Sequence, residues 1–378
     1  MSRPSNVPGN AADRRFMRLA LALGHRNLGR TWPNPSVGAV VVAGEPGAER
    51  IVGQGVTAPG GRPHAEPIAL AMAGAAGHGA TLYVSLEPCS HHGRTPPCTD
   101  AIIGAGIARV MTALTDPDPR VAGRGHGLLA EAGIAVTTGL LAEEAARDHR
   151  GHVTRVTQGR PSLHLKLAQT RDGFAGAPTE RLRITGPIAD GAVHLWRAHA
   201  DAILVGIGTA RADDPALTVR LPGLSDRSPL RVVLDSSLRI LPSTYLVRSA
   251  RDVPTLVVTT RRAPIHAKRM LASFGVEVIA VDSDRTGRID LAEALRALAE
   301  RGLTRICCEG GPGLADALAE ADLVDVFTLI TGPNALGGAG GLPAVGPALQ
   351  ERLARGHLRA IETRPLGPDR AVTYERSV

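Results

Sequence analysis

Aromatic residues are scarce in this 378-residue chain, where Phe, Trp and Tyr together make up 2% of the sequence. Proteins that hold single-stranded nucleic acid stack the bases on aromatic side chains, so this scarcity argues against that class. The formal net charge of +7 comes from basic residues that stand singly along the chain and form no Lys/Arg block. We therefore expect a small anionic substrate and no nucleic-acid partner.

The chain also lacks the patterns that mark several other classes of protein. Its four cysteines are too few for a disulfide framework in a chain of this length, so we expect free thiols or metal ligands. No apolar run reaches the roughly 18 residues that a membrane-spanning helix needs. Residues 1–15 contain no apolar core of a secretory signal. These absences predict a cytoplasmic protein without a membrane partner.

Strand-like apolar runs alternate with helical patterns in the first part of the chain. We expect helices at residues 12–27, 65–77, 99–104, 125–132 and 141–151, and strands at residues 37–43, 51–57, 81–86, 109–114 and 134–138. This alternation predicts a largely parallel sheet covered by helices. A polar, Arg-rich stretch at residues 147–161 then interrupts the pattern, and we place a domain boundary there.

A second alternating set follows this boundary. We expect strands at residues 163–170, 202–207, 231–234, 256–259, 276–281 and 305–308, and strand-like runs at 325–331, 358–363 and 371–374 close the chain. The closing runs predict an antiparallel edge to the second sheet. The Gly- and Pro-containing loop 332–346 is long enough to have a function. The sequence thus predicts two α/β domains, residues 1–150 and 161–378, joined by a linker at residues 151–160.

One histidine and two cysteines form the first candidate site. His64 opens a predicted helix two residues before Glu66, while Cys89 follows a predicted strand and Cys98 precedes a predicted helix. Three protein ligands with an open fourth position are typical of catalytic zinc, which activates water near neutral pH. Glu66 could carry the proton from that water to a leaving amine. This is the zinc-deaminase pattern, although eight residues separate the two cysteines where the usual pattern has two.

Two other interpretations of this pattern stay open. A structural zinc site is closed by a fourth protein ligand, which His91 or His92 could supply. Alternatively, the cysteines are core thiols near a surface histidine. Asn34, which stands between two prolines, could likewise mark only a rigid turn.

A second group of motifs lies beyond the boundary. No Gly-x-Gly-x-x-Gly follows the first strand there, so a Rossmann dinucleotide site is not supported. Instead, the strand at 305–308 runs into the glycine-rich segment 309–313 and a helix, where a phosphate could approach backbone amides. Lys166 is one of only two lysines and lies within an apolar strand, which suggests a chemical role. Without a ligand, the glycine-rich segment could be only a tight turn. Lys166 could be only a strand-end residue whose side chain reaches solvent.

Both halves resemble the bifunctional deaminase–reductase family of riboflavin biosynthesis. The resemblance rests on PNPSVG at residues 33–38, PHAE at 63–66, LEPCSHHGRTPPC at 86–98, VAGRG at 121–125, KLA at 166–168, DG at 172–173, the segment 209–220 and EGGP at 309–312. In that family the long spacing between the cysteines is the rule. The resemblance implies an α/β protein with a cytidine-deaminase-like three-layer domain followed by a dihydrofolate-reductase-like α/β domain.

The resemblance also implies the chemistry of the first half. It implies zinc-hydroxide deamination of 2,5-diamino-6-(5-phosphoribosylamino)pyrimidin-4(3H)-one, with zinc on His64, Cys89 and Cys98 and with Glu66 as proton shuttle. Substrate contacts are implied for two further residues, Asn34 in the pyrimidine pocket and Arg94 at the phosphate.

For the second half, the resemblance implies NADPH reduction of the phosphoribosyl group of 5-amino-6-(5-phosphoribosylamino)uracil to phosphoribityl. Lys166 and Asp213 would be catalytic, near the carbon that accepts hydride. The implied substrate contacts are Arg197, Leu217, Arg220 and Glu309, and the implied cofactor contacts are Ala168, Arg183, Thr209, Asp213, Gly310, Gly311, Pro312, Gly313 and Leu314. Arg183 stands where the family often has a tryptophan that stacks on the cofactor.

We therefore expect zinc and NADPH as cofactors, a phosphorylated pyrimidine as substrate, and a homo-oligomer, either a dimer or a tetramer. One alternative is a zinc deaminase of another nucleotide or a tRNA base, with a degenerate reductase-like second domain. It would explain the basic composition, but not the HHGRTPPC insertion. A zinc-stabilised nucleic-acid-binding protein is the non-enzymatic alternative, and its affinity would fall steeply with salt.

Overall fold

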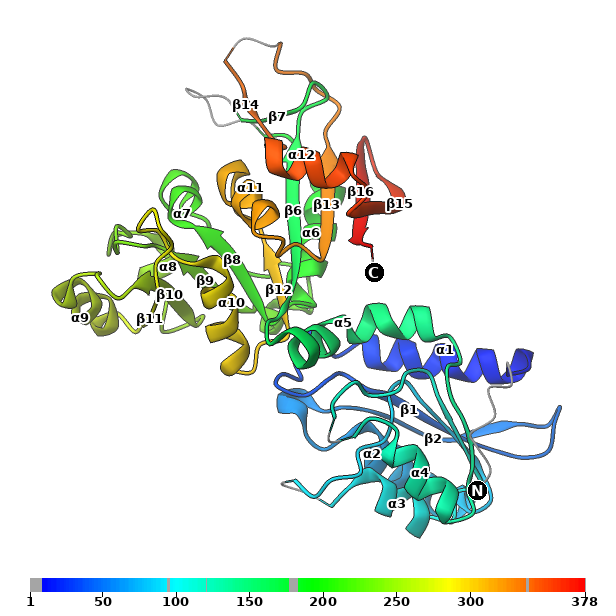
Figure 1. Cartoon of the computed structure of the whole chain (residues 1–378). Coiled ribbons are helices and arrows are strands. Elements are labelled where there is room, and N and C mark those ends of the chain that lie inside the picture. The colour runs from blue at the N-terminus through cyan, green and yellow to red at the C-terminus, as the bar shows by residue number, and fades with distance from the viewer. Residues whose placement is uncertain (1–8, 94–95, 120, 177–182, 338–339, 378) are drawn as a thin grey trace. The chain divides into compact units, whose positions relative to one another are not determined.

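The chain forms two compact units, residues 1–159 and 160–378. The computed structural model describes residues 9–93, 96–119, 121–176, 183–337 and 340–377. Figure 1 shows that helices and strands alternate along both units. Among the described residues, no helix combines the length and the apolar character that a membrane crossing requires.

The first unit contains a five-stranded mixed sheet. Its strand order is β2-β1-β3-β4-β5, with bounds β1 (Gly38–Ala43), β2 (Arg50–Val56), β3 (Thr81–Val84), β4 (Arg109–Thr112) and β5 (Ala135–Thr137). The last three strands are parallel, as predicted, but β1 is antiparallel to both β2 and β3. The segment between β1 and β2 is too short for a crossover, so these two strands can form only a hairpin.

Helices cover both faces of this sheet. They are α1 (Ala11–His25), α2 (Ala65–Ala73), α3 (Cys98–Gly104), α4 (Arg124–Glu131) and α5 (Ala142–Gln158). Because side chains alternate along a strand, Val41 packs with α2, α3 and α4, whereas Val40 packs with α1 and α5. The expected three-layer arrangement is confirmed.

Helix α5 continues through most of the segment that we expected to be a linker. Residues 151–158 form its last two turns, and the helix ends at Gly159, whose φ of 66° is the left-handed conformation that glycine favours. The polar residues that suggested a linker belong to an amphipathic helix, in which Thr154 is buried against the unit.

The second unit contains a nine-stranded sheet. Its order is β11-β10-β9-β8-β12-β6-β13-β16-β15, with bounds β6 (Ser162–Gln169), β8 (Ala202–Gly206), β9 (Leu230–Leu234), β10 (Thr255–Thr260), β11 (Glu277–Val281), β12 (Arg305–Cys308), β13 (Val326–Thr331), β15 (Leu358–Leu366) and β16 (Asp369–Arg376). Within this sheet, and among the described residues, only the pairings of β16 with β13 and β15 are antiparallel, so the predicted antiparallel edge is confirmed. Within the predicted loop 332–346, β14 (Leu342–Pro343) pairs with β7 (Phe174–Gly176).

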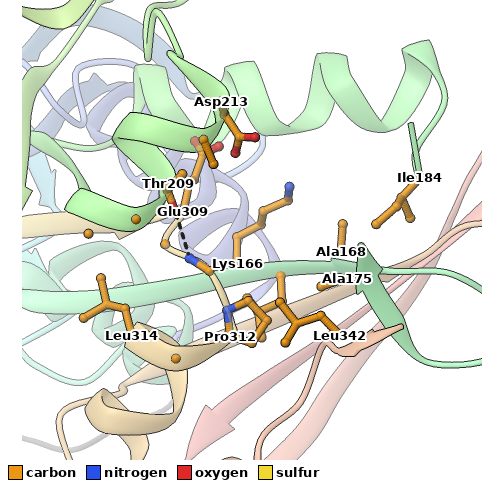
Figure 2. A pocket seen from close by; sticks show the side chains of 17 residues that line it. Lys166, Ala168, Ala175, Ile184, Thr209, Asp213, Glu309, Pro312, Leu314 and Leu342 are labelled. Atoms are coloured by element: carbon orange, nitrogen blue, oxygen red, sulfur yellow. Dashed lines mark hydrogen bonds between the residues drawn. The ribbon is translucent and has the colours of Figure 1, made fainter. Parts of the chain in front are cut away.

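Three neighbouring parallel strands bring the second group of motifs together. The helices of this unit are α6 (Pro187–Ala198), α7 (Ile207–Asp213), α8 (Tyr245–Arg248), α9 (Ile265–Ser273), α10 (Leu291–Glu300), α11 (Pro312–Glu320) and α12 (Pro347–Ala354). Since β8, β12 and β6 are adjacent and parallel, their carboxyl ends meet at one edge. Figure 2 shows the result, with Lys166, Thr209 and Glu309 around one space.

Candidate active sites

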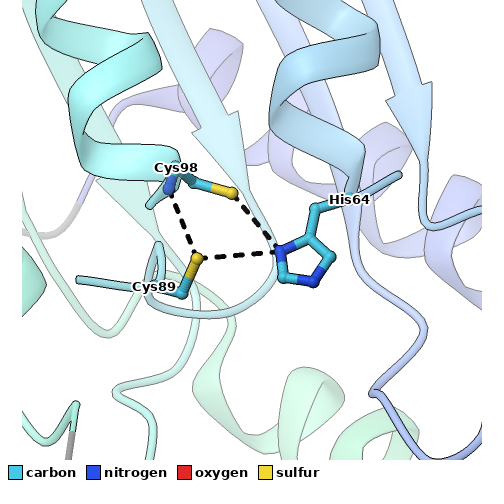
Figure 3. Close-up of side chains that lie close together, drawn as sticks. All are labelled: His64, Cys89 and Cys98. Atoms are coloured by element: carbon cyan, nitrogen blue, oxygen red, sulfur yellow. Dashed lines mark hydrogen bonds between the residues drawn. The ribbon is translucent and has the colours of Figure 1, made fainter. Parts of the chain in front are cut away.

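His64, Cys89 and Cys98 meet in the first unit with the geometry of a metal site (Figure 3). His64 precedes α2, Cys98 begins α3, and Cys89 lies after β3. The Nδ1 atom of His64 lies 3.7 Å from Cys89 Sγ and 3.4 Å from Cys98 Sγ, and all three donor atoms lie within 4.8 Å of one another. One imidazole and two thiols suit zinc.

No fourth ligand joins this group within the described part of the chain. His91 and His92 are described, but neither belongs to the cluster of possible metal ligands. The arrangement therefore favours an open, catalytic site over a closed, structural one.

The two thiols differ in acidity. The hydrogen bond between them lowers the pKa of Cys89 to about 4 and raises the pKa of Cys98. The backbone N–H of Cys98 also donates to Cys89 Sγ at 3.3 Å. Cys89 is thus ready to bind a cation as the thiolate, and a bound cation would favour loss of the second proton.

Glu66 lies in the first turn of α2 and is buried, with 3% of its surface exposed. Burial raises the pKa of its carboxyl group to about 7, and the negative charge of Cys89 adds to this effect. A carboxyl group with a pKa near neutrality can both accept and donate a proton under physiological conditions. Glu66 and the ligands His64 and Cys89 line the same cavity.

This first cavity has a volume of about 150 Å³, and its lining residues come from five separate segments of the chain. The described lining residues are Pro33, Asn34, Pro35, Val37, Thr57, Arg62, His64, Glu66, Leu86, Glu87, Cys89, His91, Asp116, Asp118, Val121, His152, Arg155 and Val156. Asn34 is among them, as expected, and its Nδ2 donates to the carbonyl of Gly61 at 2.8 Å. Arg94, the expected phosphate contact, lies outside the described residues.

Buried Glu87 organises one wall of the first cavity. Its carboxylate accepts hydrogen bonds from the backbone N–H groups of Asp116 (3.2 Å), Gly123 (3.0 Å) and Gly125 (3.0 Å). A Cβ at Gly125 would lie 2.3 Å from the carbonyl oxygen of Pro88, so only glycine fits there. This close approach gives a physical reason for Gly125 of the VAGRG segment, and the hydrogen bond to Glu87 holds the backbone of Asp116 at the cavity.

The polar lining residues that sequence analysis did not predict as site residues include Arg62, Asp116, His152 and Arg155. His152 and Arg155 both lie on α5, within the segment expected to be a linker. Positions 152, 155 and 156 have the spacing of one helix face, which is the signal that could have found them. That signal becomes informative only when the helix is known to extend past residue 151.

The second cavity, of about 550 Å³, lies in the second unit (Figure 2). Most of the predicted catalytic and cofactor residues line it: Lys166, Ala168, Thr209, Asp213, Glu309, Gly310, Gly311, Pro312, Gly313 and Leu314. The rest of its wall is Leu167, Ala175, Ile184, Gly206, Gly208, Ala212 and Leu342. The side chain of Lys166 extends from β6 into this space.

Glycines leave backbone exposed on one side of the second cavity. Helix α11 begins after Gly311, whose N–H donates to Thr209 Oγ1 at 3.1 Å. A Cβ at Gly208 or Gly313 would meet no other heavy atom within 4 Å. Open backbone beside a helix N-terminus suits the phosphates of a dinucleotide, so the residues present fit NADPH.

Four of the predicted residues do not line the second cavity. The guanidinium of Arg197 binds both carboxylate oxygens of Glu309, at 2.6 and 2.8 Å. Leu217 is buried, and Arg220 is exposed. Arg183 is exposed too, and its side chain contacts Asp190 at 3.1 Å. The charge of Arg197, which we expected to contact the substrate, is thus balanced by Glu309.

Two known family descriptions match the chain. The RibD C-terminal domain matches residues 161–372, and the cytidine and deoxycytidylate deaminase zinc-binding region matches residues 10–114. The riboflavin biosynthesis protein RibD of Escherichia coli is 40% identical over 380 residues, which cover 94% of this chain and 97% of that protein. The RibD protein of Aquifex aeolicus is 37% identical, with 96% and 98% covered.

Solved structures agree with these relatives over nearly the whole chain. RibD of Acinetobacter baumannii superposes with a TM-score of 0.83 at 31% identity and covers 97% of this chain and 99% of that chain. A Thermotoga maritima deaminase/reductase gives a TM-score of 0.81 at 32% identity, with the same coverage. The two cavities, the two matched domains and these relatives show that the chain belongs to the RibD family and is a bifunctional deaminase and reductase of riboflavin biosynthesis.

Proposed function

We propose that the two cavities act in succession on one phosphorylated pyrimidine. The Thermotoga relative is named a diaminohydroxyphosphoribosylaminopyrimidine deaminase/5-amino-6-(5-phosphoribosylamino)uracil reductase. The first cavity would remove the 2-amino group of 2,5-diamino-6-(5-phosphoribosylamino)pyrimidin-4(3H)-one as ammonia. The second would use NADPH to reduce the phosphoribosyl group of the product to phosphoribityl.

The observation that carries this proposal is that Glu66 lines one cavity with His64 and Cys89, whose donor atoms lie within 4.8 Å of each other and of Cys98 Sγ. Zinc, when bound by these ligands, lowers the pKa of water to roughly 7. Glu66 takes a proton from the attacking water and gives it to the leaving amine, because its own pKa lies near neutrality. Asn34, which lines the same cavity, holds the pyrimidine ring.

The polar rim of the first cavity suits a ribose phosphate. Asp116 and Asp118 line it and offer carboxylate oxygens that accept hydrogen bonds from ribose hydroxyl groups. Arg62 and Arg155 also line it, and guanidinium groups bind phosphate oxygens in pairs. These side chains favour a phosphoribosyl pyrimidine over a free base.

In the second cavity the backbone of residues 310–313 would hold the cofactor phosphates, with Thr209 beside them. NADPH, when bound, supplies the hydride. Lys166 donates a hydrogen bond from Nζ to an oxygen of the ribosyl group, and Asp213 orients that group from α7. The pair formed by Glu309 and Arg197 fixes the carboxylate that faces the substrate.

The proposal also covers the cellular compartment and the oligomeric state of the protein. We infer a cytoplasmic enzyme that forms a homo-oligomer, either a dimer or a tetramer, on the resemblance to the family. Sedimentation at several protein concentrations would test the assembly, and a monomer throughout would contradict it.

The decisive experiment supplies the full chain with the diaminopyrimidine phosphate and follows ammonia release, then adds NADPH and follows its oxidation. Ammonia release without NADPH and oxidation only afterwards are expected. The alternative, a zinc deaminase of another nucleotide or a tRNA base, predicts ammonia from cytidine nucleotides or tRNA and none from the diaminopyrimidine. The family to which the chain belongs does not favour that alternative.

A further inference from the structure

Helix α5 supplies a polar wall to the first cavity. His152, Arg155 and Val156 of this helix line the cavity together with Asp116, which lies after β4. The Nε2 atom of His152 lies 3.0 Å from Asp116 Oδ1. Both side chains are nearly buried, with 11% and 10% of their surfaces exposed. The contact therefore joins two distant parts of the chain inside the site.

We propose that His152 is a positioning residue for the deamination, which fixes the carboxylate of Asp116 for contact with the substrate. This inference rests on the proposed function of the first cavity and adds a residue to it. Because a carboxylate oxygen only accepts hydrogen bonds, Nε2 of His152 carries the hydrogen and donates it.

The hydrogen bonds around Asp116 leave one of its oxygens available. Oδ1 accepts from His152 and from the backbone N–H of Asp118 at 2.9 Å. Among the described residues, no hydrogen bond engages Oδ2. The backbone N–H of Asp116 is itself held by Glu87 at 3.2 Å. One oxygen thus fixes the carboxylate, and the other can accept a hydrogen bond from a ligand in the cavity.

The carboxylate of Asp116 needs a hydrogen-bond donor such as His152 to hold its orientation. Glu87, Asp116 and Asp118 all lie at the same wall, and like charges drive unrestrained side chains apart. A charge-assisted hydrogen bond between buried partners opposes that movement. Without His152, Asp116 would keep its backbone position and the hydrogen bond from the N–H of Asp118, but its side chain would lose the donor on α5 and be less firmly oriented. The substrate would bind more weakly, while Glu66 and the zinc ligands would be unchanged.

The test compares His152→Ala and His152→Gln with the wild-type full chain, loaded with zinc. For ammonia release from the diaminopyrimidine phosphate, His152→Ala should raise KM about tenfold and leave kcat within about twofold. This pattern is expected when a lost contact had stabilised the bound substrate and the transition state equally. His152→Gln should restore much of the affinity, because its amide N–H can reach Asp116. Thr157→Ala is the matched control, since Thr157 is exposed on the same helix. Zinc content reports that the first unit of each variant is folded, and NADPH oxidation reports the same for the second unit.

A second comparison separates positioning from a general effect on the fold. In an Asp116→Ala background, His152→Ala should change KM less than twofold, because its partner is already gone. A wild-type KM in His152→Ala would overturn the inference, as would an equal rise with and without Asp116 or a failure of His152→Gln to recover affinity. If the wild-type chain releases no ammonia from this substrate, the proposed function itself fails.

Discussion

Glu66 shares one cavity with the candidate metal ligands His64 and Cys89, but we expect it to have a different chemical task. Glu66→Gln removes the ionisable group and keeps nearly the same shape, so we expect zinc content to stay at about one per chain. Ammonia release should fall by roughly 10²- to 10⁴-fold, the usual contribution of a general acid–base group. Metal analysis and an ammonia assay on the same sample would check this. Loss of zinc together with activity would make Glu66 a ligand and contradict its assignment.

The cysteines provide the second prediction at this scale. Cys89→Ser should lose zinc and lower the melting temperature of the first unit, because a thiolate ligand is gone and metal binding energy is also folding energy. Cys307→Ser is the matched control, since Cys307 is buried in β12 and belongs to no metal cluster of the described residues. It should keep full zinc content. Equal zinc in the two variants would refute the ligand set.

At the scale of elements, the turn between β6 and β7 holds the loop that leads to β14. The carboxylate of Asp172 accepts hydrogen bonds from the N–H groups of Leu336 at 2.9 Å and Gly337 at 3.0 Å. The hydroxyl of Thr170, together with these N–H groups, lowers the pKa of Asp172 to about 2, so the contacts persist at neutral pH. Leu342, at the end of this loop, lines the second cavity.

We expect Asp172→Ala to release this loop and raise the KM for NADPH several-fold, while ammonia release stays unchanged. Asp284→Ala is the matched control. Asp284 makes a similar turn, accepting from the N–H groups of Thr286 and Arg288, but it does not line the cavity. Steady-state NADPH oxidation would measure both variants. An equal KM in the two would show that the loop contacts do not support cofactor binding.

For the whole molecule, we predict that the two activities are separable. Each unit has its own sheet, its own core and its own cavity. Glu66→Gln should therefore leave the reduction of independently supplied deaminated substrate within about twofold of wild type. Lys166→Ala or Asp213→Asn should reduce NADPH oxidation strongly while ammonia release continues, because both residues line the second cavity and we propose that they act on the second reaction alone.

Two results would contradict separability or part of the function. If every such substitution abolished both activities in folded protein, the units would be coupled. If the wild-type chain released ammonia but oxidised no NADPH on the deaminated intermediate, the reductase would be degenerate. Arg183 makes the second result worth testing, since it is exposed and does not line the cavity.

The sequence alone determined the elements and the centres of the two sites. Strand and helix periodicity are local, and they predicted the helices and strands of the first unit and the strands of the large second sheet, including its antiparallel edge. In the second unit, α11 is the one helix that we predicted among those of the described residues. The candidate ligands of the first site lie at the starts of two helices and after the end of a strand. Such positions can be predicted from a few neighbouring residues. The glycine-rich segment after β12 is local in the same way, and it lies at the second cavity as expected.

Only the tertiary structure decided which distant side chains meet. His152 reaches Asp116 because α5 packs along the first unit, a contact between residues 36 positions apart that no local pattern encodes. Arg197 and Glu309 pair across 112 positions, so the sequence could not show that the charge of Arg197 is balanced. Arg231, in a strand predicted from its apolar neighbours, is fully buried and donates to backbone carbonyls of Leu246, Ser249 and Val253. Burial of a charged group depends on the partners that the fold brings to it.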